Sequence, residues 1–257
     1  MYRVLAYRRT GNLGDAIQTV ALCRLLGQPC RGVFRDEVTR EPPTGMPFVV
    51  NGWLGDIVPA PGESCIFAGV HVAYQGAEQL AWLKASDHAI GARDPYTYGV
   101  LAQHGMKPTL ASCATLTFER YHGVRKGRYT IDVDPIAGCI PLTNRINTHP
   151  WRKQWGLALE RLEQIRKAER VYTNRLHIIL PCLAFGTPVV FPKADLADTH
   201  DKPRLTILDL LGLQYDEEVV MDIEVWAETY RRFLSTALNT TLRPVETPHC
   251  PDIPQTQ

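Results

Sequence analysis

The sequence predicts an α/β protein made of two successive units. Short apolar runs alternate with helix-like stretches along the 257 residues, a pattern typical of mostly parallel strands covered by helices on both faces. Near the middle, residues 119–128 are polar and basic and contain Gly123 and Gly127, which favours a linker. We therefore expect the following parts: an N-terminal unit over residues 1–120, a compact second unit over 128–220, a helix over 221–243 and a disordered tail over 244–257.

Composition and charge exclude several classes of protein. With 45% apolar residues, 21% charged residues and a net charge of +1, the chain has no arm for nucleic acid and no patch for a membrane surface. No stretch reaches the roughly 18 apolar residues of a membrane span, and the N-terminus resembles a short strand more than a signal peptide. The seven cysteines include no CxxC pair, which favours reduced thiols in a cytoplasmic protein. The acids and the histidine within 194–201 lack a recognisable ligand spacing, so we expect no metal site.

The first strand, residues 2–7, leads into a helix through a turn with two glycines. Gly11 and Gly14 permit a tight turn and a close approach of the backbone. Asn12 and Asp15 can cap the helix or contact a ligand. A glycine pair in a strand-to-helix turn is a weak signal, and a simple capped turn is the more common explanation for it.

Capping signals are clear around Arg93. Asp94 fits the N-cap of a helix, Pro95 fits its first position, and Gly105 fits the position after its C-cap. Arg93 would thus lie at the C-terminal end of a strand, directly before a helix. There it could bind an anion or pair with a neighbouring carboxylate.

The second unit begins with a strand over residues 129–133. A helix is predicted over 151–168, where Trp155, Ala158, Leu162 and Ile165 share one face. Residues 204–211 favour a short helix, and Asp222 would cap a long amphipathic helix that ends at Leu238.

Between these helices lies the most informative stretch, residues 171–191. An apolar strand ends at Thr173, and a helix follows whose first turn would carry Arg175 and His177. Such a passage directs a helix N-terminus at the carboxyl edge of a sheet, where anions bind. Lys193 follows the next strand at the same edge, although a lysine there is more commonly a solvated charge.

Several separated segments also form a joint pattern. They are residues 11–15 (Gly-Asn-Leu-Gly-Asp), 50–53 (Val-Asn-Gly-Trp), 90–97 (Ile-Gly-Ala-Arg-Asp-Pro-Tyr-Thr), 111–117 (Ala-Ser-Cys-Ala-Thr-Leu-Thr) and 173–177 (Thr-Asn-Arg-Leu-His), with Gly-Thr-Pro at 186–188. Together they resemble the polysaccharide pyruvyl transferase family. The resemblance implies two Rossmann-like domains facing a cleft, as in GT-B glycosyltransferases, with a compact second domain here. It also implies transfer of the pyruvyl group of phosphoenolpyruvate onto two sugar hydroxyls, with no metal or other cofactor required.

The resemblance assigns roles to residues. Arg175 would hold the phosphate or carboxylate of phosphoenolpyruvate, and His177 would protonate its enol carbon, since histidine titrates near neutral pH. Asp15 is a candidate base. The substrate-binding residues that we expect are Arg93, Lys193, Asn12, Asn51, Asn174 and Ser112.

Two alternatives remain open at this point. A GT-B glycosyltransferase would use a nucleotide sugar and an acidic residue, for which Glu217 or Glu218 could be proposed, to bind the ribose. A non-catalytic glycan-binding relative would keep the fold without the chemistry. The chain is shorter than family members usually are, so the acceptor, lipid-linked or free, and the oligomeric state stay open.

Overall fold

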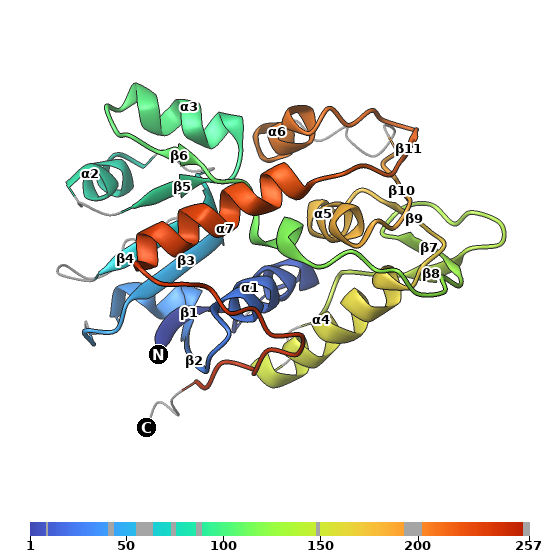
Figure 1. Ribbon diagram of the computed structural model, residues 1–257, viewed down its shortest axis with the longest axis horizontal. Helices are drawn as coiled ribbons and strands as arrows, with labels where there is room; N and C mark the ends of the chain where they lie inside the picture. The colour runs from blue at the N-terminus through green and yellow to red at the C-terminus, as the bar shows by residue number, and fades with distance from the viewer. Residues whose placement is uncertain are drawn as a thin grey trace.

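The computed structural model describes residues 1–8, 10–40, 44–54, 64–72, 76–85, 89–147, 150–192 and 202–253. Within this part of the chain there are two separate sheets, which Figure 1 shows on the left and on the right. The first has the order β2-β1-β3-β4-β5-β6, and all its strand pairs are parallel. Its strands are β1 (Tyr2–Ala6), β2 (Cys30–Phe34), β3 (Phe48–Trp53), β4 (Cys65–His71), β5 (Ile90–Ala92) and β6 (Thr109–Leu110).

The second sheet has the order β11-β10-β9-β7-β8 and is parallel except where β11 pairs antiparallel with β10. Its strands are β7 (Arg128–Ile131), β8 (Ile140–Leu142), β9 (Arg170–Thr173), β10 (Val189–Val190) and β11 (Glu218–Val219). The helices of the chain are α1 (Leu13–Leu26), η1 (Arg35–Arg40), α2 (Ala77–Ala85), α3 (Pro95–Gln103), η2 (Ala114–Thr117), α4 (Trp151–Arg166), α5 (Leu176–Phe185), α6 (Lys202–Leu210) and α7 (Glu224–Leu238).

The two sheets share one topological feature. In the first, the chain passes from β1 out to β2 and returns to β3 on the other side of β1. In the second, it passes from β7 out to β8 and returns to β9 on the other side of β7. Each sheet therefore has a switch point where the strand order reverses, which is where α/β proteins commonly bind ligands. Helix α1 starts after β1, and α5 starts after β9, so each begins beside the switch point of its own sheet.

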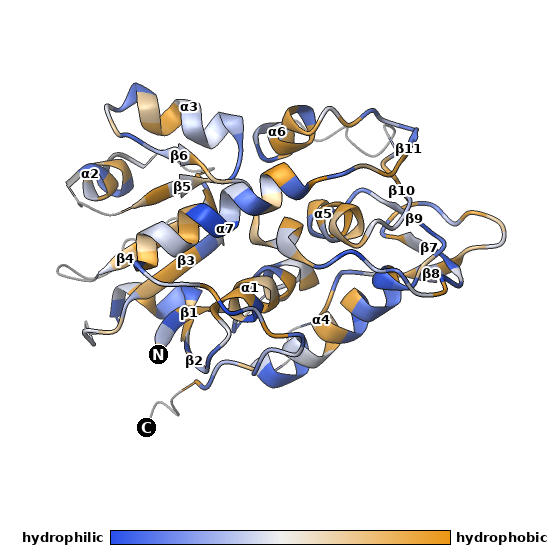
Figure 2. Cartoon of the chain, in the orientation of Figure 1, coloured by the Kyte–Doolittle hydropathy of each residue, from blue (hydrophilic) through white to orange (hydrophobic). Residues whose placement is uncertain are grey.

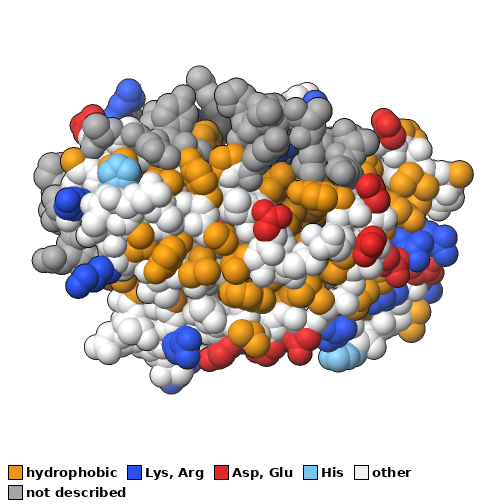
Figure 3. Space-filling view, turned by 90° about the horizontal axis from the view of Figure 1, so that it is seen from above, with side chains coloured by type: hydrophobic (Ala, Val, Ile, Leu, Met, Phe, Trp, Pro, Cys, Tyr) orange, Lys and Arg blue, Asp and Glu red, His pale blue; other side chains and the backbone are white. Residues whose placement is uncertain are grey.

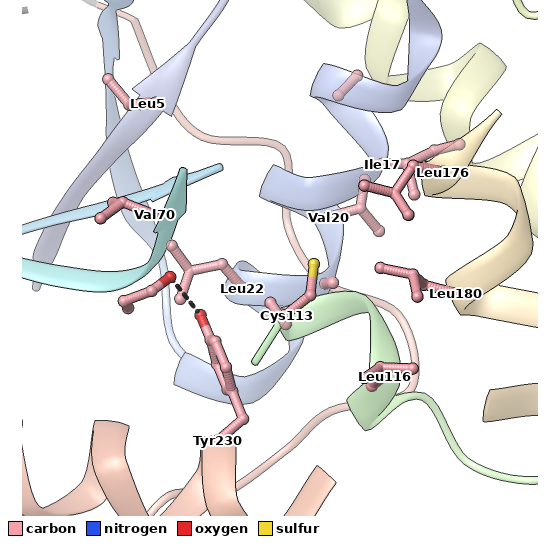
Figure 4. Packing of buried hydrophobic residues seen from close by; sticks show 14 of the residues in the cluster. Leu5, Ile17, Val20, Leu22, Val70, Cys113, Leu116, Leu176, Leu180 and Tyr230 are labelled. Atoms are coloured by element: carbon pink, nitrogen blue, oxygen red, sulfur yellow. Dashed lines mark hydrogen bonds between the residues drawn. The ribbon is translucent and has the colours of Figure 1, made fainter. Parts of the chain in front are cut away.

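Helices α1 and α5 pack against each other in the core. Both are buried almost all round, whereas α4 and α7 keep polar residues on their outer faces (Figure 2). Figure 4 shows Ile17 and Val20 of α1 facing Leu176 and Leu180 of α5. The buried apolar side chains of both sheets form one continuous cluster. This packing brings the two helix starts together.

Helix α7 returns from the second sheet to the first. Its Tyr230 hydroxyl donates a hydrogen bond of 3.0 Å to the backbone oxygen of Ala68 in β4, drawn in Figure 4. The helix begins at Glu224, and Asp222 accepts a hydrogen bond from the backbone N–H of Glu224. Asp222 therefore lies one residue before the observed N-cap, Ile223.

The C-terminal segment corrects a prediction. We expected disorder over 244–257, but residues 244–253 lie along α1 and β2. The backbone of Asp252 both donates to Cys30 at 3.0 Å and accepts from Gly32 at 2.8 Å, and Val245 donates to Arg24. The prediction failed because prolines exclude a helix but still permit an extended strand-like segment at a sheet edge. Residues 254–257 lie outside the described part of the chain.

The predicted α/β class with mostly parallel sheets is confirmed. The arrangement as two domains facing a cleft, and the domain boundaries, stay predictions. Among the described residues, no helix is long and apolar enough to cross a membrane. Charged side chains of both signs are scattered over the face shown in Figure 3 and form no large patch of one sign, which fits the net charge of +1.

Candidate functional site

The starts of α1 and α5 touch each other. A Cβ atom built on Gly14 would lie 3.1 Å from Cβ of His177 and 3.2 Å from its Nδ1. These distances are tighter than ordinary contacts, so glycine at this position lets the α1 turn approach the imidazole. The glycine turn and the Arg-Leu-His segment, predicted from distant parts of the sequence, therefore form one site.

A loop of the second sheet reinforces this contact. The backbone N–H of Leu13 donates to Asn144 at 2.8 Å, and the N–H of Ile146 donates to Gly11 at 3.1 Å. The side chain of Asn144 donates to Oδ1 of Asn12 at 3.4 Å. These bonds fix the α1 turn relative to the second sheet.

Burial marks the same place from both sides. Every residue of α1 is buried except Asp15, and every residue of α5 is buried except His177. Asp15 is therefore the one partly exposed residue of α1, and His177 is the one partly exposed residue of α5. The two side chains lie on the helix turns that meet at Gly14.

The start of α5 is irregular. Its N-cap is Arg175, whose side chain makes no capping hydrogen bond, and His177 departs from helical geometry with φ −83° and ψ 20°. Pro181 explains the irregularity, because it lacks the N–H that would bond to the carbonyl of His177 and its ring crowds that carbonyl. We had placed Arg175 within the first turn, and the structure places it just before that turn.

His177 is a neutral imidazole in the free protein. Burial is the main reason that its pKa lies well below the ordinary value, and the positive charges of Arg93 and Arg204 lower that pKa further. Its Nε2 is buried and has no hydrogen-bond partner in the described part of the chain. A buried nitrogen without a partner is uncommon and is suited to bind a substrate.

Arg175 is held by a carboxylate of the neighbouring strand end. Its Nε donates to Oδ2 of Asp132 at 2.7 Å. Asp132 follows β7, has a left-handed backbone with φ 55°, and also accepts from the Thr143 hydroxyl and the N–H of Asn144. The guanidinium is therefore oriented beside the switch point of the second sheet.

Arg93 is buried and also paired. Its Nε and one terminal nitrogen each lie 3.1 Å from Oδ2 of Asp94. The guanidinium of Arg93 also donates to the backbone oxygen of Arg204 at 3.4 Å. The predicted cap is confirmed, since the N–H of Thr97 donates to Oδ1 of Asp94 at 2.9 Å. Of the two interpretations given to Arg93, pairing with a carboxylate is the one that the contacts show. The same arginine lies close enough to His177 to lower its pKa.

Asp15 is partly exposed and accepts a hydrogen bond of 2.7 Å from the Thr10 hydroxyl. Burial raises its pKa, against the opposing effects of that hydrogen bond and of the charges of Arg35 and Arg204. Two arginines that the sequence did not single out are therefore near this carboxyl group.

The remaining predicted residues differ in their surroundings. Asn12 caps α1 by accepting from the N–H of Gly14 at 3.0 Å. Asn51 is buried within β3, near its C-terminal end, where its Nδ2 donates to the backbone of Gln18 and its Oδ1 has no partner among the described residues. Asn174 is half-buried beside Arg175.

Ser112 has a left-handed backbone with φ 70°, and its hydroxyl oxygen accepts from the N–H of Cys113 and lies 3.5 Å from the backbone oxygen of Trp226. It therefore links the chain after β6 to α7. Lys193 and the acids within 194–201 lie outside the described residues. Elsewhere in the described chain, no three His, Cys, Asp or Glu side chains converge in a way that could hold a metal ion.

Comparisons with known proteins identify the family of this chain. The model of the family described as polysaccharide pyruvyl transferase matches residues 12–191. The chain belongs to this family. No curated protein matches the chain. A solved structure of an uncharacterised protein from Klebsiella pneumoniae subsp. pneumoniae aligns over 86% of this chain and 93% of that one, with 13% sequence identity and a TM-score of 0.53, which supports the fold alone.

The polysaccharide pyruvyl transferase match covers the site unevenly. It includes Asn12, Asp15, Arg93 and His177, whereas Arg204 lies beyond its end. Sequence reasoning missed Arg204, since a lone arginine in a short helix carries no signal. It could have found Asp132, because a residue directly after β7 shares the sheet edge with the residues after β9.

Proposed function

We propose that this polysaccharide pyruvyl transferase moves the pyruvyl group of phosphoenolpyruvate onto two hydroxyls of a sugar or glycan acceptor, forming a cyclic ketal and releasing phosphate. The observation that carries the proposal is the contact of Gly14 with His177 at the uncapped start of α5. There, two helix N-termini and several arginines surround one imidazole.

The donor side is built for an anion with more than one charge. Phosphoenolpyruvate carries a phosphate and a carboxylate, so it favours guanidinium groups and free N–H groups of a helix start. Arg175 flanks the start of α5, and its side chain is oriented by Asp132. The charges of Arg93 and Arg204 lower the pKa of His177, so they act at the same place.

The bound donor would prepare His177 for its role as acid. In the free protein its pKa is held low by burial and by the arginines. The negative charges of phosphoenolpyruvate would offset those arginines and raise that pKa, because an opposite charge nearby favours the protonated imidazole. Imidazolium can then give its proton to the enol carbon, which leaves positive charge at the neighbouring carbon.

The acceptor side would lie on the first sheet. The first sugar hydroxyl adds to the positively charged carbon and loses its proton, the carbon–phosphate oxygen bond breaks, and the second hydroxyl closes the ketal. Of the two hydroxyl protons, one ends on the new methyl group and one on phosphate. Asp15 would accept a hydrogen bond from an acceptor hydroxyl, and Asn51, whose buried Oδ1 lacks a partner in the described chain, could accept one from the other.

The proposal is tested with the purified full chain. It is incubated with phosphoenolpyruvate and a panel of sugar acceptors, free and lipid-linked, and both phosphate release and the mass of the acceptor are measured. We expect phosphate release together with a mass gain of one pyruvyl ketal. In parallel, the melting temperature of the protein is measured in the presence of phosphoenolpyruvate and in the presence of UDP-sugars. Stabilisation by nucleotide sugars alone would favour a glycosyltransferase and refute the proposal.

A further inference from the structure

His71 forms a buried pair with Asp94 beside the candidate site. It is the last residue of β4 and is 3% exposed. Its Nδ1 lies 2.7 Å from Oδ2 of Asp94, which follows the neighbouring strand β5. Because β4 and β5 are parallel, both residues lie at the same carboxyl edge as the rest of the site.

The contacts determine which nitrogen of His71 carries its proton. Oδ2 of Asp94 also accepts a hydrogen bond from Nε of Arg93 and forms an ion pair with a terminal nitrogen of the same guanidinium. Burial alone would raise the pKa of Asp94, but Arg93 and the hydrogen bond of His71 hold it below its usual range. An ionised carboxylate only accepts, so Nδ1 must be the protonated nitrogen, and Nε2 is left as the basic one.

Capping of α3 does not account for the pair. Asp94 caps α3 through Oδ1, which accepts from the N–H of Thr97 at 2.9 Å. The other oxygen, Oδ2, is the one that holds His71 and Arg93. The Thr97 hydroxyl lies 3.2 Å from Nδ1 and accepts from the N–H of Val72, so it holds the ring from a second side. A carboxylate that orients the Nδ1 proton of a buried histidine is the arrangement that general bases use.

His71 shares its electrostatic surroundings with His177. The charge of His71 contributes to the low pKa of His177, and the charges of Arg93 and Arg204 act on both rings. Burial and Arg93 lower the pKa of His71, against the opposing effect of Asp94. His71 is thus neutral near pH 7 and able to accept a proton there.

We propose that His71, oriented by Asp94, is the base that takes the proton of the first acceptor hydroxyl. The inference rests on the proposed function. His177 protonates the enol carbon, and the hydroxyl oxygen bonds to the neighbouring carbon while its proton passes to Nε2 of His71. His71 returns this proton to the departing phosphate. The proton of the second hydroxyl restores the imidazolium of His177, so both histidines end as they began.

The test is the substitution His71→Asn. An asparagine amide can occupy the position of Nδ1 and still donate to Asp94, but it has no basic nitrogen. We expect a loss of about 100-fold or more in the rate of ketal formation, with phosphoenolpyruvate affinity and melting temperature close to those of the unchanged protein. The control is His122→Asn, which removes an exposed histidine and should keep the full rate. His71→Gln is a second variant if His71→Asn does not fold.

The outcomes separate the two proposals. If the wild-type protein binds no phosphoenolpyruvate and forms no ketal, the proposed function itself is refuted. If the wild-type protein is active and the His71→Asn variant has the same rate, only this inference is refuted. A purely positioning role for His71 would be rescued by asparagine and lost in His71→Leu, and that result also overturns the assignment as base.

Discussion

The starts of α1 and α5 are both strand-to-helix turns, but they differ in how the first turn of the helix is capped. Each follows a parallel strand at the switch point of its sheet. At α1, the side chain of Asn12 caps the helix by accepting from Gly14. At α5, the side chain of the N-cap residue Arg175 makes no capping hydrogen bond, and Pro181 distorts the first turn around His177.

This difference in capping indicates which of the two helix starts binds the anion. A helix start that is capped by its own side chain has one fewer N–H group to offer a ligand. An uncapped start keeps those groups for an anion, and an arginine and a histidine lie there as well. We infer that α5 provides the anion site and that α1 provides the surface against which His177 is held.

Removing the imidazole of His177 should have the largest effect on the reaction. In His177→Gln, we expect ketal formation to fall by roughly a hundredfold to ten-thousandfold, because general acid catalysis contributes about that much. Because the glutamine amide replaces one buried polar group with another, the variant should have about the same stability as the wild-type protein. The measurements are single-turnover rates and denaturant midpoints. A fully active variant would show that His177 is not the acid.

The close approach of the two helix starts is tested at Gly14. A methyl group there would press on Cβ and Nδ1 of His177, so Gly14→Ala should displace the ring by a few tenths of an ångström. We expect the rate to fall about tenfold, because catalysis depends strongly on geometry. Gly11→Ala is the matched control, since a Cβ there has no atom within 4 Å. Equal rates for both variants would contradict a functional contact at Gly14.

The ion pair of Arg175 is expected to have a smaller effect. Asp132→Asn keeps the left-handed backbone, which asparagine tolerates, but removes the charge that orients the guanidinium. The KM for phosphoenolpyruvate should rise about threefold to tenfold while kcat changes less, as initial rates at varied donor concentration would show. A change in kcat with an unaltered KM would place Arg175 away from the donor.

The pH dependence of stability gives the mildest test. The folded protein holds the pKa values of His177 and His71 below the ordinary value. Below about pH 6.5 the unfolded chain therefore binds protons that the folded chain does not, and the free energy of unfolding must decrease as the pH falls. Urea midpoints between about pH 5 and pH 7 should show this decrease, and His177→Gln should show less of it. A flat profile would mean that both rings protonate freely in the folded protein.

Local signals predicted the elements better than the contacts between them. Asp94 and Pro95 predicted the start of α3 correctly because an N-cap and a first-turn proline act over only a few residues. His71 carried no signal, since its partner Asp94 lies 23 residues away, after another strand. Prolines in the tail suggested disorder, yet an isolated β-bridge pairs Asp252 with Arg31 of β2.

The meeting of Gly14 and His177 followed only from the family resemblance, because no spacing in the sequence relates the two sheets. The sequence predicts that each residue lies at the carboxyl edge of its own sheet, but it does not predict that the two edges meet. That step depends on how Ile17 and Val20 of α1 pack against α5, which is a property of the whole core (Figure 4).

The central claim is that phosphoenolpyruvate binds beside His177 and causes it to take up a proton. Calorimetric titration of phosphoenolpyruvate near pH 7, in buffers of different ionisation enthalpy, measures the protons taken up on binding. The unchanged protein should take up nearly one proton more than His177→Gln. Equal proton uptake by both proteins, or no binding of phosphoenolpyruvate to the unchanged protein, would contradict the claim.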